Sequence, residues 1–410
     1  MTLSATDTRN AWTFAAVVAL AWLAACVYAA TGAELRGDEY AHVPQLELFL
    51  RGDWRFMRDA MTTVPAYHAL IASIMRVLGL DGLGAARVIA GAAYLFAIAG
   101  FVRLRRAVLG RDDWLGDAQF AAFPLMAPFA FLIYTDVASL AAMLWATEAS
   151  VRARHLRAAL ILVFALAMRQ NNVYWIAFLA ALATWPALRA QGFASLRATL
   201  PPLWPYLVPC VVFAGYWAWN GSISFSPLQS AMHPDASLHV GNLYFMLFCA
   251  ALLLPLQVLD GLRRYATQLR TRPWLVVLPL ALVGLYYAAF AVDHPYNLIE
   301  NSVSWRNRTL QLTQASAAFK ALFGIVAALA AVGIAWQPLV NASARWLYPL
   351  GALFVCLSWL VEQRYYLIPL ALFLAFRVPL SRRAELATLA LWCILAVFLF
   401  HGMISGNWYL

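Results

Sequence analysis

Residues 11–31 read AWTFAAVVALAWLAACVYAAT, a run without a single charged side chain. A bilayer core about 30 Å thick needs about 20 apolar residues in helical conformation. The run therefore predicts a first transmembrane helix, and the N-terminus before it is expected on the cytoplasmic side. Because no small-residue cleavage site follows, we expect this helix to be retained rather than removed as a signal peptide.

The rest of the chain keeps this apolar character. Of its 410 residues, 64% are hydrophobic and 12% are charged, with a mean hydropathy of +0.71, whereas a soluble domain has about 25% charged residues. Apolar segments recur as far as residue 402, and several are shorter than a full span. The sequence predicts an all-α polytopic membrane protein, one domain over 1–410, with about 11–14 membrane helices, some short or re-entrant.

The positive charge is concentrated in short clusters between apolar segments. The net charge is +10, and the arginine clusters lie at 103–106, 152–157, 263–272 and 382–383. Cytoplasmic loops of membrane proteins carry such clusters, so we expect no nucleic-acid partner and assign these clusters to the cytoplasm. The outside loops are then 32–65, 220–239 and 293–317.

This topology has one conflict and one consequence. Segments 66–80 and 85–102 cannot both span if 32–65 is outside and 103–117 is inside. Either one of them is a surface or re-entrant piece, or the RLRR cluster at 103–106 does not mark the cytoplasmic side. Nearly every unusual polar cluster falls on the outside, where nucleotide-activated donors are absent. Group transfer there would need a lipid-carried donor.

The first outside loop places two carboxylates and a histidine together, in Arg36-Gly37-Asp38-Glu39-Tyr40-Ala41-His42. A carboxylate held about 3 Å from a hydroxyl can take its proton. The alternative is a solvated loop with ordinary charges. Asp38 and Glu39 are the candidate catalytic residues.

Two further polar clusters interrupt apolar runs. Tyr134-Thr135-Asp136 places a carboxylate at a depth where it must face a cavity or a partner, although Asp136 could instead cap the next helix. Arg169-Gln170-Asn171 heads a helix pair, and Arg169 could grip a phosphate or simply reach the membrane boundary.

The later loops supply aromatic, amide and charged groups of the kinds that sugars and phosphates need. They contain His294, Trp305 and Arg306, followed by Glu362, Arg364 and Tyr365; an interfacial aromatic belt and an internal Glu362–Arg364 pair are the structural alternatives. His233, Asp235 and His239 have no standard zinc spacing, and the five cysteines stand singly. The sequence predicts no metal and no cofactor.

Six of these motifs, in order from about residue 36 to 369, resemble the dolichyl-phosphate-glucose α-1,2-glucosyltransferase family. They are the DE-x-x-H motif at 38–42, TTVP at 62–65, FPL and YTD at 123–136, RQNN at 169–172, HP at 294–295 with WR at 305–306, and E-x-RYY-x-x-P at 362–369. The loop at Gly221-Ser222 lacks the family's charged pattern, and the region 294–308 conforms only in part. Acceptor identity is therefore the least constrained feature.

The resemblance implies a GT-C bundle that transfers glucose, with inversion, from a polyprenyl-phosphate to a sugar hydroxyl of a glycolipid or glycan. It implies Asp38 as the base, with Glu39 as the alternative or as its orienting neighbour. It also implies a lipid phosphate bound by Arg169, Arg306 and Arg364, with Gln170 and Asn171 beside it, and no metal requirement. The remaining polar residues are expected to contact substrate: His42, Tyr134, Asp136, His294, Trp305, Glu362 and Tyr365.

Arginine strongly outnumbers lysine, and Lys320 is the only lysine. This composition suggests a bacterial inner-membrane enzyme that faces the periplasm and uses an undecaprenyl-type carrier. The alternatives are a GT-C enzyme with a mannose, arabinose or aminosugar donor, a lipid-linked-sugar transporter, and an accessory membrane subunit. A transporter should show repeated halves and charges near the bilayer midplane, whereas this chain gathers its polar groups at one face.

Overall fold

The computed structural model describes residues 5–32, 34–235, 237–298 and 307–406, with side chains from residue 13 onward. This part of the chain forms helices, short 3-10 turns and loops, with a single isolated antiparallel bridge between Leu339 and Arg377. The α-helices are α1 (Ala5–Thr31), α2 (Glu39–Leu50), α3 (Ala66–Leu78), α4 (Gly82–Leu109), α5 (Trp114–Ala121), α6 (Thr135–Val151), α7 (His155–Met168), α8 (Tyr174–Gln191), α9 (Leu196–Thr199), α10 (Leu207–Asn220), α11 (Gly241–Leu253), α12 (Pro255–Leu269), α13 (Val277–Ala289), α14 (Arg308–Ala315), α15 (Ala317–Ala335), α16 (Leu347–Cys356), α17 (Leu367–Phe376) and α18 (Arg382–Ser405).

The chain is a multi-pass membrane protein. Among the described residues, five helical stretches are long and apolar enough to cross a membrane: Thr13–Thr31, Gly82–Leu109, Gln170–Thr199, Ala317–Ala335 and Arg382–Ser405. A sixth is α11 with α12, if that pair is counted as one span despite its 102° bend. Pro255 begins α12 and has no backbone N–H to continue the hydrogen bonding of α11, so the apolar stretch is broken there. Many of the other expected segments are shorter helices, as the sequence predicted.

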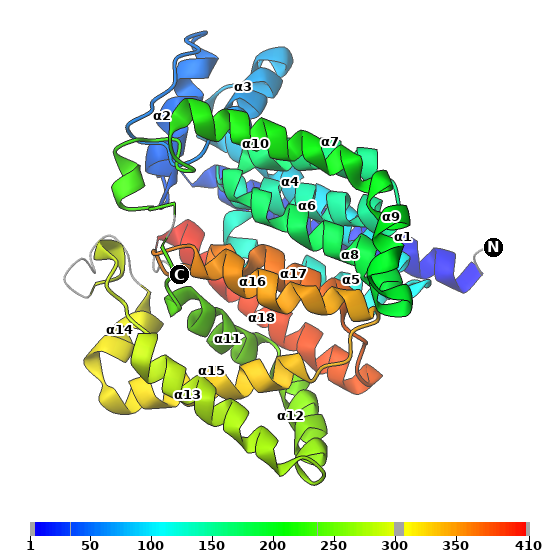
Figure 1. The fold of residues 1–410 in the computed structure, drawn as a ribbon. Coiled ribbons are helices and arrows are strands. Elements are labelled where there is room, and N and C mark those ends of the chain that lie inside the picture. The colour runs from blue at the N-terminus through cyan, green and yellow to red at the C-terminus, as the bar shows by residue number, and fades with distance from the viewer. Residues whose placement is uncertain (1–4, 33, 236, 299–306, 407–410) are drawn as a thin grey trace.

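The centre of the bundle consists of helices that are buried on every side. All ten residues of α17 are buried, and 15 of the 17 residues of α6 are buried. A helix that is apolar all round belongs inside a bundle. By contrast, α10 and α13 each have one buried residue, Pro209 and Tyr286 respectively, and expose the rest of an apolar surface. Figure 1 shows the long helices side by side, with α2 and α3 beyond one end.

Small residues let some helices meet backbone to backbone. A Cβ atom on Gly333 of α15 would lie 2.6 Å from the carbonyl oxygen of Val258 in α12, and Gly261 faces Gly333 from the other side. Such close approach is typical of helix pairs in membranes, where dispersion contacts replace the hydrophobic effect. The contact fixes α12 against the end of α15 that lies away from α2 and α3.

That far end also holds a buried polar network. Arg105 donates to the last carbonyls of α17, those of Leu374 (3.0 Å) and Ala375 (2.9 Å), and pairs with Asp113 at 2.8 Å. Arg377 pairs with Glu385 at 2.6 Å, with both side chains less than 5% exposed. These contacts satisfy helix-end carbonyls and charges that have no access to water.

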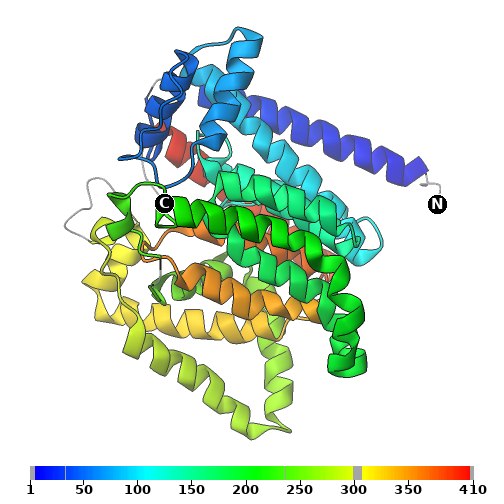
Figure 2. The same cartoon turned by 45° about the horizontal axis from the view of Figure 1, so that its top comes forward.

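The structure resolves the conflict between segments 66–80 and 85–102. Segment 82–109 is the long helix α4, whereas α3 has only 13 residues and packs on α2 and α4. Its exposed side carries Val77 and Leu78. The surface piece is therefore 66–80. Figures 1 and 2 place α2 and α3 at the opposite end of the molecule from the N-terminus.

Candidate active site

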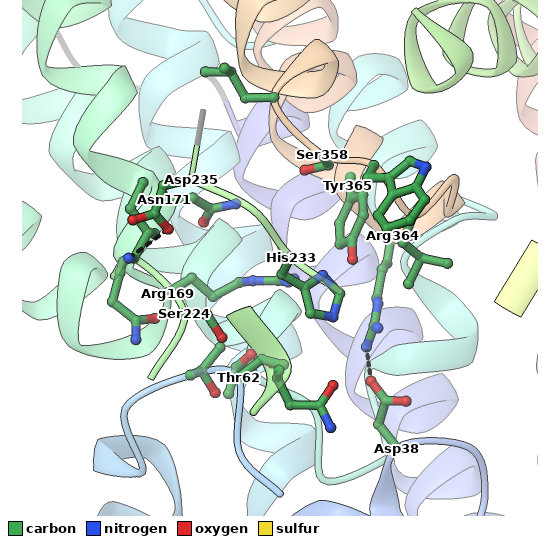
Figure 3. A pocket seen from close by; sticks show the side chains of 18 of the residues that line it. Asp38, Thr62, Arg169, Asn171, Ser224, His233, Asp235, Ser358, Arg364 and Tyr365 are labelled. Carbon is green, nitrogen blue, oxygen red and sulfur yellow. Dashed lines mark hydrogen bonds and ion pairs between the residues drawn. The ribbon is translucent and has the colours of Figure 1, made fainter. Parts of the chain in front are cut away.

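A cavity of about 270 Å³ lies at the α2–α3 end of the bundle. It is lined by residues of the first loop (38–63), the start of α6, the α7–α8 junction (169–174), the loop before α11 (223–235), Tyr296 and the segment 354–365. These are the parts of the chain in which sequence reasoning found its polar clusters. The fold therefore gathers those clusters around one space (Figure 3).

Asp38 reaches this cavity because the loop before it turns tightly. Gly37 has φ +53°, and an added Cβ there would collide with the Tyr134 hydroxyl, so glycine is required on both counts. The backbone N–H of Asp38 donates to Tyr134 Oη at 2.6 Å. Asp38 occupies the N-cap of α2, but its side chain makes no cap hydrogen bond. Its carboxylate instead accepts from Arg364.

Glu39 points elsewhere, although it is the next residue. Its side chain is fully buried and pairs with Arg87 of α4, whose Nε lies 3.0 Å from Glu39 Oε1. Glu39 does not line the cavity. Of the two adjacent carboxylates, only Asp38 faces the cavity.

Two arginines and three carboxylates form a charged centre, which consists of Arg169, Arg364, Asp38, Asp136 and Glu362. Arg364 bonds Asp38 and Glu362 (2.6 Å to Glu362) and lies 3.9 Å from Asp136, while Arg169 pairs with Asp136. Asp136 therefore has a charged partner, and the cap interpretation is wrong because the N-cap of α6 is Tyr134. Among the described residues, Asp136 is the only hydrogen-bond acceptor of the Arg169 side chain, which also lines the cavity. Much of its guanidinium fork is thus available to an anion.

Tyrosines support both guanidinium groups. The Arg169 guanidinium lies 5.3 Å from the ring centroid of Tyr365, and that of Arg364 lies 5.4 Å from Tyr134 and 5.7 Å from Tyr365. Contacts of this kind hold a cation over an aromatic face. Figure 3 shows Arg364 directed at Asp38 and Arg169 extended across the cavity toward His233.

Burial and the charge of Arg364 act against each other on two carboxyl groups here, and the net pKa shifts of Asp38 and Glu362 have opposite signs. Burial tends to raise the pKa of Asp38, but the nearby charge and hydrogen bond of Arg364 outweigh it and hold that pKa below its usual range. Burial also raises the pKa of Glu362, in this case to about 7, although Arg364 opposes the shift. Asp38 is therefore ionised at neutral pH, as a general base must be, while Glu362 is partly protonated.

The other predicted residues that the structure describes lie at or near the cavity wall. His42 lines the cavity, with its Nδ1 2.8 Å from Nε2 of His68, and burial lowers the pKa of His42 to about 4. Gln170 donates to the Tyr216 hydroxyl at 3.0 Å. Asn171 lines the cavity and keeps a buried Oδ1 without a described hydrogen-bond partner. His294 is set behind the wall, where its ring packs on Trp359 at 4.8 Å. Trp305 and Arg306 lie outside the described residues.

The chain matches the model of a known protein family. The family model of the DIE2/ALG10 family matches residues 34–196 and 189–375, which cover most of the chain and all the described cavity residues. The chain belongs to the DIE2/ALG10 family. The resemblance inferred from six motifs is thereby confirmed.

Curated relatives agree with the family assignment. A protein of Drosophila melanogaster is 26% identical over 381 residues, which cover 82% of this chain and 82% of the relative. One of Yarrowia lipolytica is 25% identical over 301 residues, which cover 64% of this chain and 57% of the relative. Both are named Dol-P-Glc:Glc(2)Man(9)GlcNAc(2)-PP-Dol alpha-1,2-glucosyltransferase. These relatives are eukaryotic and give the expected bacterial source no support. No solved structure matches the chain significantly.

Several cavity residues of this DIE2/ALG10 protein were not among the predicted site residues. Thr62 and Thr63 line the cavity, and their signal was the TTVP motif, which sequence analysis used only as a resemblance. His233 and Asp235 also line it; they stood out as polar residues but were assigned no role. Arg87, which binds Glu39 outside the cavity, gave no signal beyond a lone charge inside the apolar run of α4.

The raised pKa of Glu362 predicts how stability depends on pH. A carboxyl group that binds its proton more tightly when folded stabilises the fold fully below its unfolded pKa and loses that contribution as pH rises through its folded pKa, here about 7. We expect Glu362→Gln, which stays neutral, to lose less stability than wild type as pH rises from about 5 to about 8, with a melting-temperature gap that grows by about 3 °C or more. Thermal unfolding in detergent measures this, with the exposed Glu47→Gln as the control. Parallel curves for wild type and Glu362→Gln would contradict it.

Proposed function

We propose that this chain transfers a hexose, glucose in the first instance, from a polyprenyl-phosphate donor to a sugar hydroxyl of a glycolipid or glycan, with inversion at the anomeric carbon. One observation carries the proposal: an ionised, cavity-facing Asp38 is held beside the buried guanidinium group of Arg364, with the half-buried Arg169 in the same cavity. A base and a phosphate site side by side are what transfer from a sugar phosphate requires. The names of the relatives supply the choice of glucose.

In the proposed reaction, Asp38 accepts the proton of the acceptor hydroxyl while that oxygen attacks the anomeric carbon. The bond from this carbon to the phosphate oxygen breaks on the opposite face, and the polyprenyl phosphate leaves with the electron pair. Arg169 and Arg364 stabilise the negative charge that grows on the phosphate. We propose that these two cations fill the role that a divalent metal would otherwise have, so that neither metal nor cofactor takes part.

The other residues in and around the cavity receive positioning roles in this proposal. Gln170 and Asn171 flank Arg169 and can donate amide N–H groups to the phosphate or the sugar. His42, Tyr134, Asp136, Glu362 and Tyr365 surround the charged centre, while His294 holds Trp359 at the wall. For the residues outside the described structure, Trp305 and Arg306, acceptor or phosphate contact remains the expectation from the sequence.

We propose that the cavity faces away from the cytoplasm. It lies at the end of the bundle opposite the N-terminus (Figure 1), and Arg105 of the basic cluster at 103–106 is bonded at the far end of α17. Cytoplasmic ends carry such clusters. A polyprenyl carrier would then present its sugar at the outer membrane surface, where the cavity is.

The test is a transfer assay with purified protein in lipid. Donors would be dolichyl-phosphate and undecaprenyl-phosphate forms of glucose, mannose, arabinose and an aminosugar, offered with a panel of glycolipid acceptors. We expect turnover with glucose on at least one carrier and at least about tenfold less with the other sugars. Preference for another sugar would make the chain a GT-C enzyme of different specificity. Movement of the intact lipid-linked sugar across the bilayer without transfer would support a transporter instead.

A further inference from the structure

The pair formed by Glu39 and Arg87 has more partners than a membrane-buried ion pair needs. Arg87 donates to both carboxylate oxygens of Glu39 and also to three carbonyl oxygens, those of Ala29 (3.1 Å), Gly32 (2.7 Å) and Glu34 (2.7 Å). Both side chains are 0% exposed. The guanidinium therefore ties the end of α1 and the start of the first loop to α4.

Glu39 connects this cation to the two backbone segments that carry the charged centre. Its Oε2 accepts the backbone N–H of Arg36 at 3.0 Å, and its Oε1 accepts that of Ile133 at 3.1 Å. Ile133 precedes Tyr134, whose hydroxyl accepts the N–H of Asp38 at 2.6 Å. A closed ring of contacts thus runs from Glu39 through Ile133 and Tyr134 to Asp38 and back along the chain.

We propose that Glu39 and Arg87 are positioning residues that set the place of Asp38 relative to Arg364. This inference rests on the proposed function, because it assigns Asp38 the role of base. The physical reason is geometric: Asp38 is the N-cap residue of α2, and the ring fixes both the start of that helix and the segment leading into α6. A shift of about 1 Å at a reacting group can cost about 100-fold in rate.

The alternative is a purely structural pair that only stabilises the fold. A double variant distinguishes the positioning role from the purely structural role. Glu39→Gln or Arg87→Met alone leaves a buried charge without its partner, which is strongly destabilising. Glu39→Gln with Arg87→Met removes both charges, so the part of the loss that comes from an unpaired buried charge should return, while the three carbonyls still lack their donor. If the pair positions Asp38, turnover should not return with it.

A second ion pair in the same chain provides the matched control. Arg377 and Glu385 are also buried, but they lie at the far end of α17, away from the cavity. Glu385→Gln should lower the melting temperature as Glu39→Gln does. It should leave the turnover of each folded, donor-binding molecule unchanged.

The experiment measures kcat per donor-binding site, donor affinity, melting temperature and amide hydrogen exchange of the segments 36–46 and 130–136. For the double variant we expect kcat to be lowered by about 100-fold, donor affinity to change by less than about threefold, and exchange in both segments to rise by about tenfold or more. Glu385→Gln should show neither the loss of kcat nor the faster exchange in the two segments. Recovery of kcat in step with stability in the double variant, or unchanged exchange in both segments, would overturn the proposal.

The exchange readout does not depend on turnover. If wild type transfers no sugar while the double variant still shows increased exchange at 36–46 and 130–136, the anchoring by Glu39 and Arg87 stands and the proposed function fails. If wild type turns over and exchange is unaffected, the proposed function stands and the anchoring fails.

Discussion

Asp38→Asn is expected to abolish sugar transfer, with kcat lowered by about 1,000-fold or more. Asparagine keeps the size of the side chain but cannot accept the proton of an acceptor hydroxyl. The fold should survive the change because Arg364 keeps Glu362 at 2.6 Å and Asp136 at 3.9 Å as carboxylate partners. Donor affinity should therefore stay within a few-fold of wild type, and the loss should appear in kcat.

The control for this variant comes from the same loop. Asp53 is paired with the exposed Arg55 at 2.6 Å and does not line the cavity, so Asp53→Asn should transfer sugar at the wild-type rate. Rates are compared at saturating donor, with donor binding measured separately. Full activity in Asp38→Asn would remove the base assignment, and activity lost equally in both variants would point to damage of the loop instead.

Arg364→Gln is expected to have the second-largest effect, with kcat/KM lowered by about 1,000-fold. This side chain bonds the base directly and also contributes to the proposed phosphate site, so its loss affects catalysis and binding together. Without its charge the pKa of Asp38 should rise, because Arg364 holds that pKa below its usual range. Both kcat and donor affinity should fall.

Arg169→Gln separates the two effects. Arg169 pairs with Asp136 and has no described hydrogen bond to Asp38, so its loss should weaken donor affinity more than it lowers kcat. The exposed Arg55→Gln is the control for arginine removal in general. Two measurements, titration of donor binding and turnover at saturating donor, distinguish Arg169→Gln, Arg364→Gln and the control Arg55→Gln. Identical profiles for Arg169→Gln and Arg364→Gln would contradict the division of roles, and unchanged donor affinity in both would remove the phosphate site.

Much of the architecture could be predicted from the sequence because membrane physics restricts the choices. A chain this apolar must satisfy its backbone within helices, and the arginine clusters separate the two ends. What could not be predicted was local. Segment 118–134 appeared to be one apolar run, yet helix α5 ends at Ala121 and the chain continues through a 3-10 turn (Ala127–Phe129) to Tyr134. Buried neighbours satisfy that irregular backbone, and nothing in the run itself identifies them.

For the charged centre too, one part could be predicted from the sequence and another part could not. The sequence indicated Asp38, Arg169 and Arg364 as members of one site, and the structure brings all three to one cavity. It could not decide between Asp38 and Glu39, because two neighbouring residues at the start of a helix point in directions about 100° apart, and only tertiary contacts determine which one meets the cavity. Arg87, the partner that holds Glu39 away from the cavity, lies 48 residues further along the chain.

The long separation of the charged partners has a consequence for how the protein is made. Asp38 and Arg364 are 326 positions apart, and α17 and α18 follow Arg364 in the chain. During synthesis the first loop is complete long before its counter-charge exists, so the nascent chain holds a carboxylate with no cation to fix it. The cavity can form only when most of the chain has been inserted. A chain whose synthesis stops before Arg364 therefore lacks the ion pair between Asp38 and Arg364.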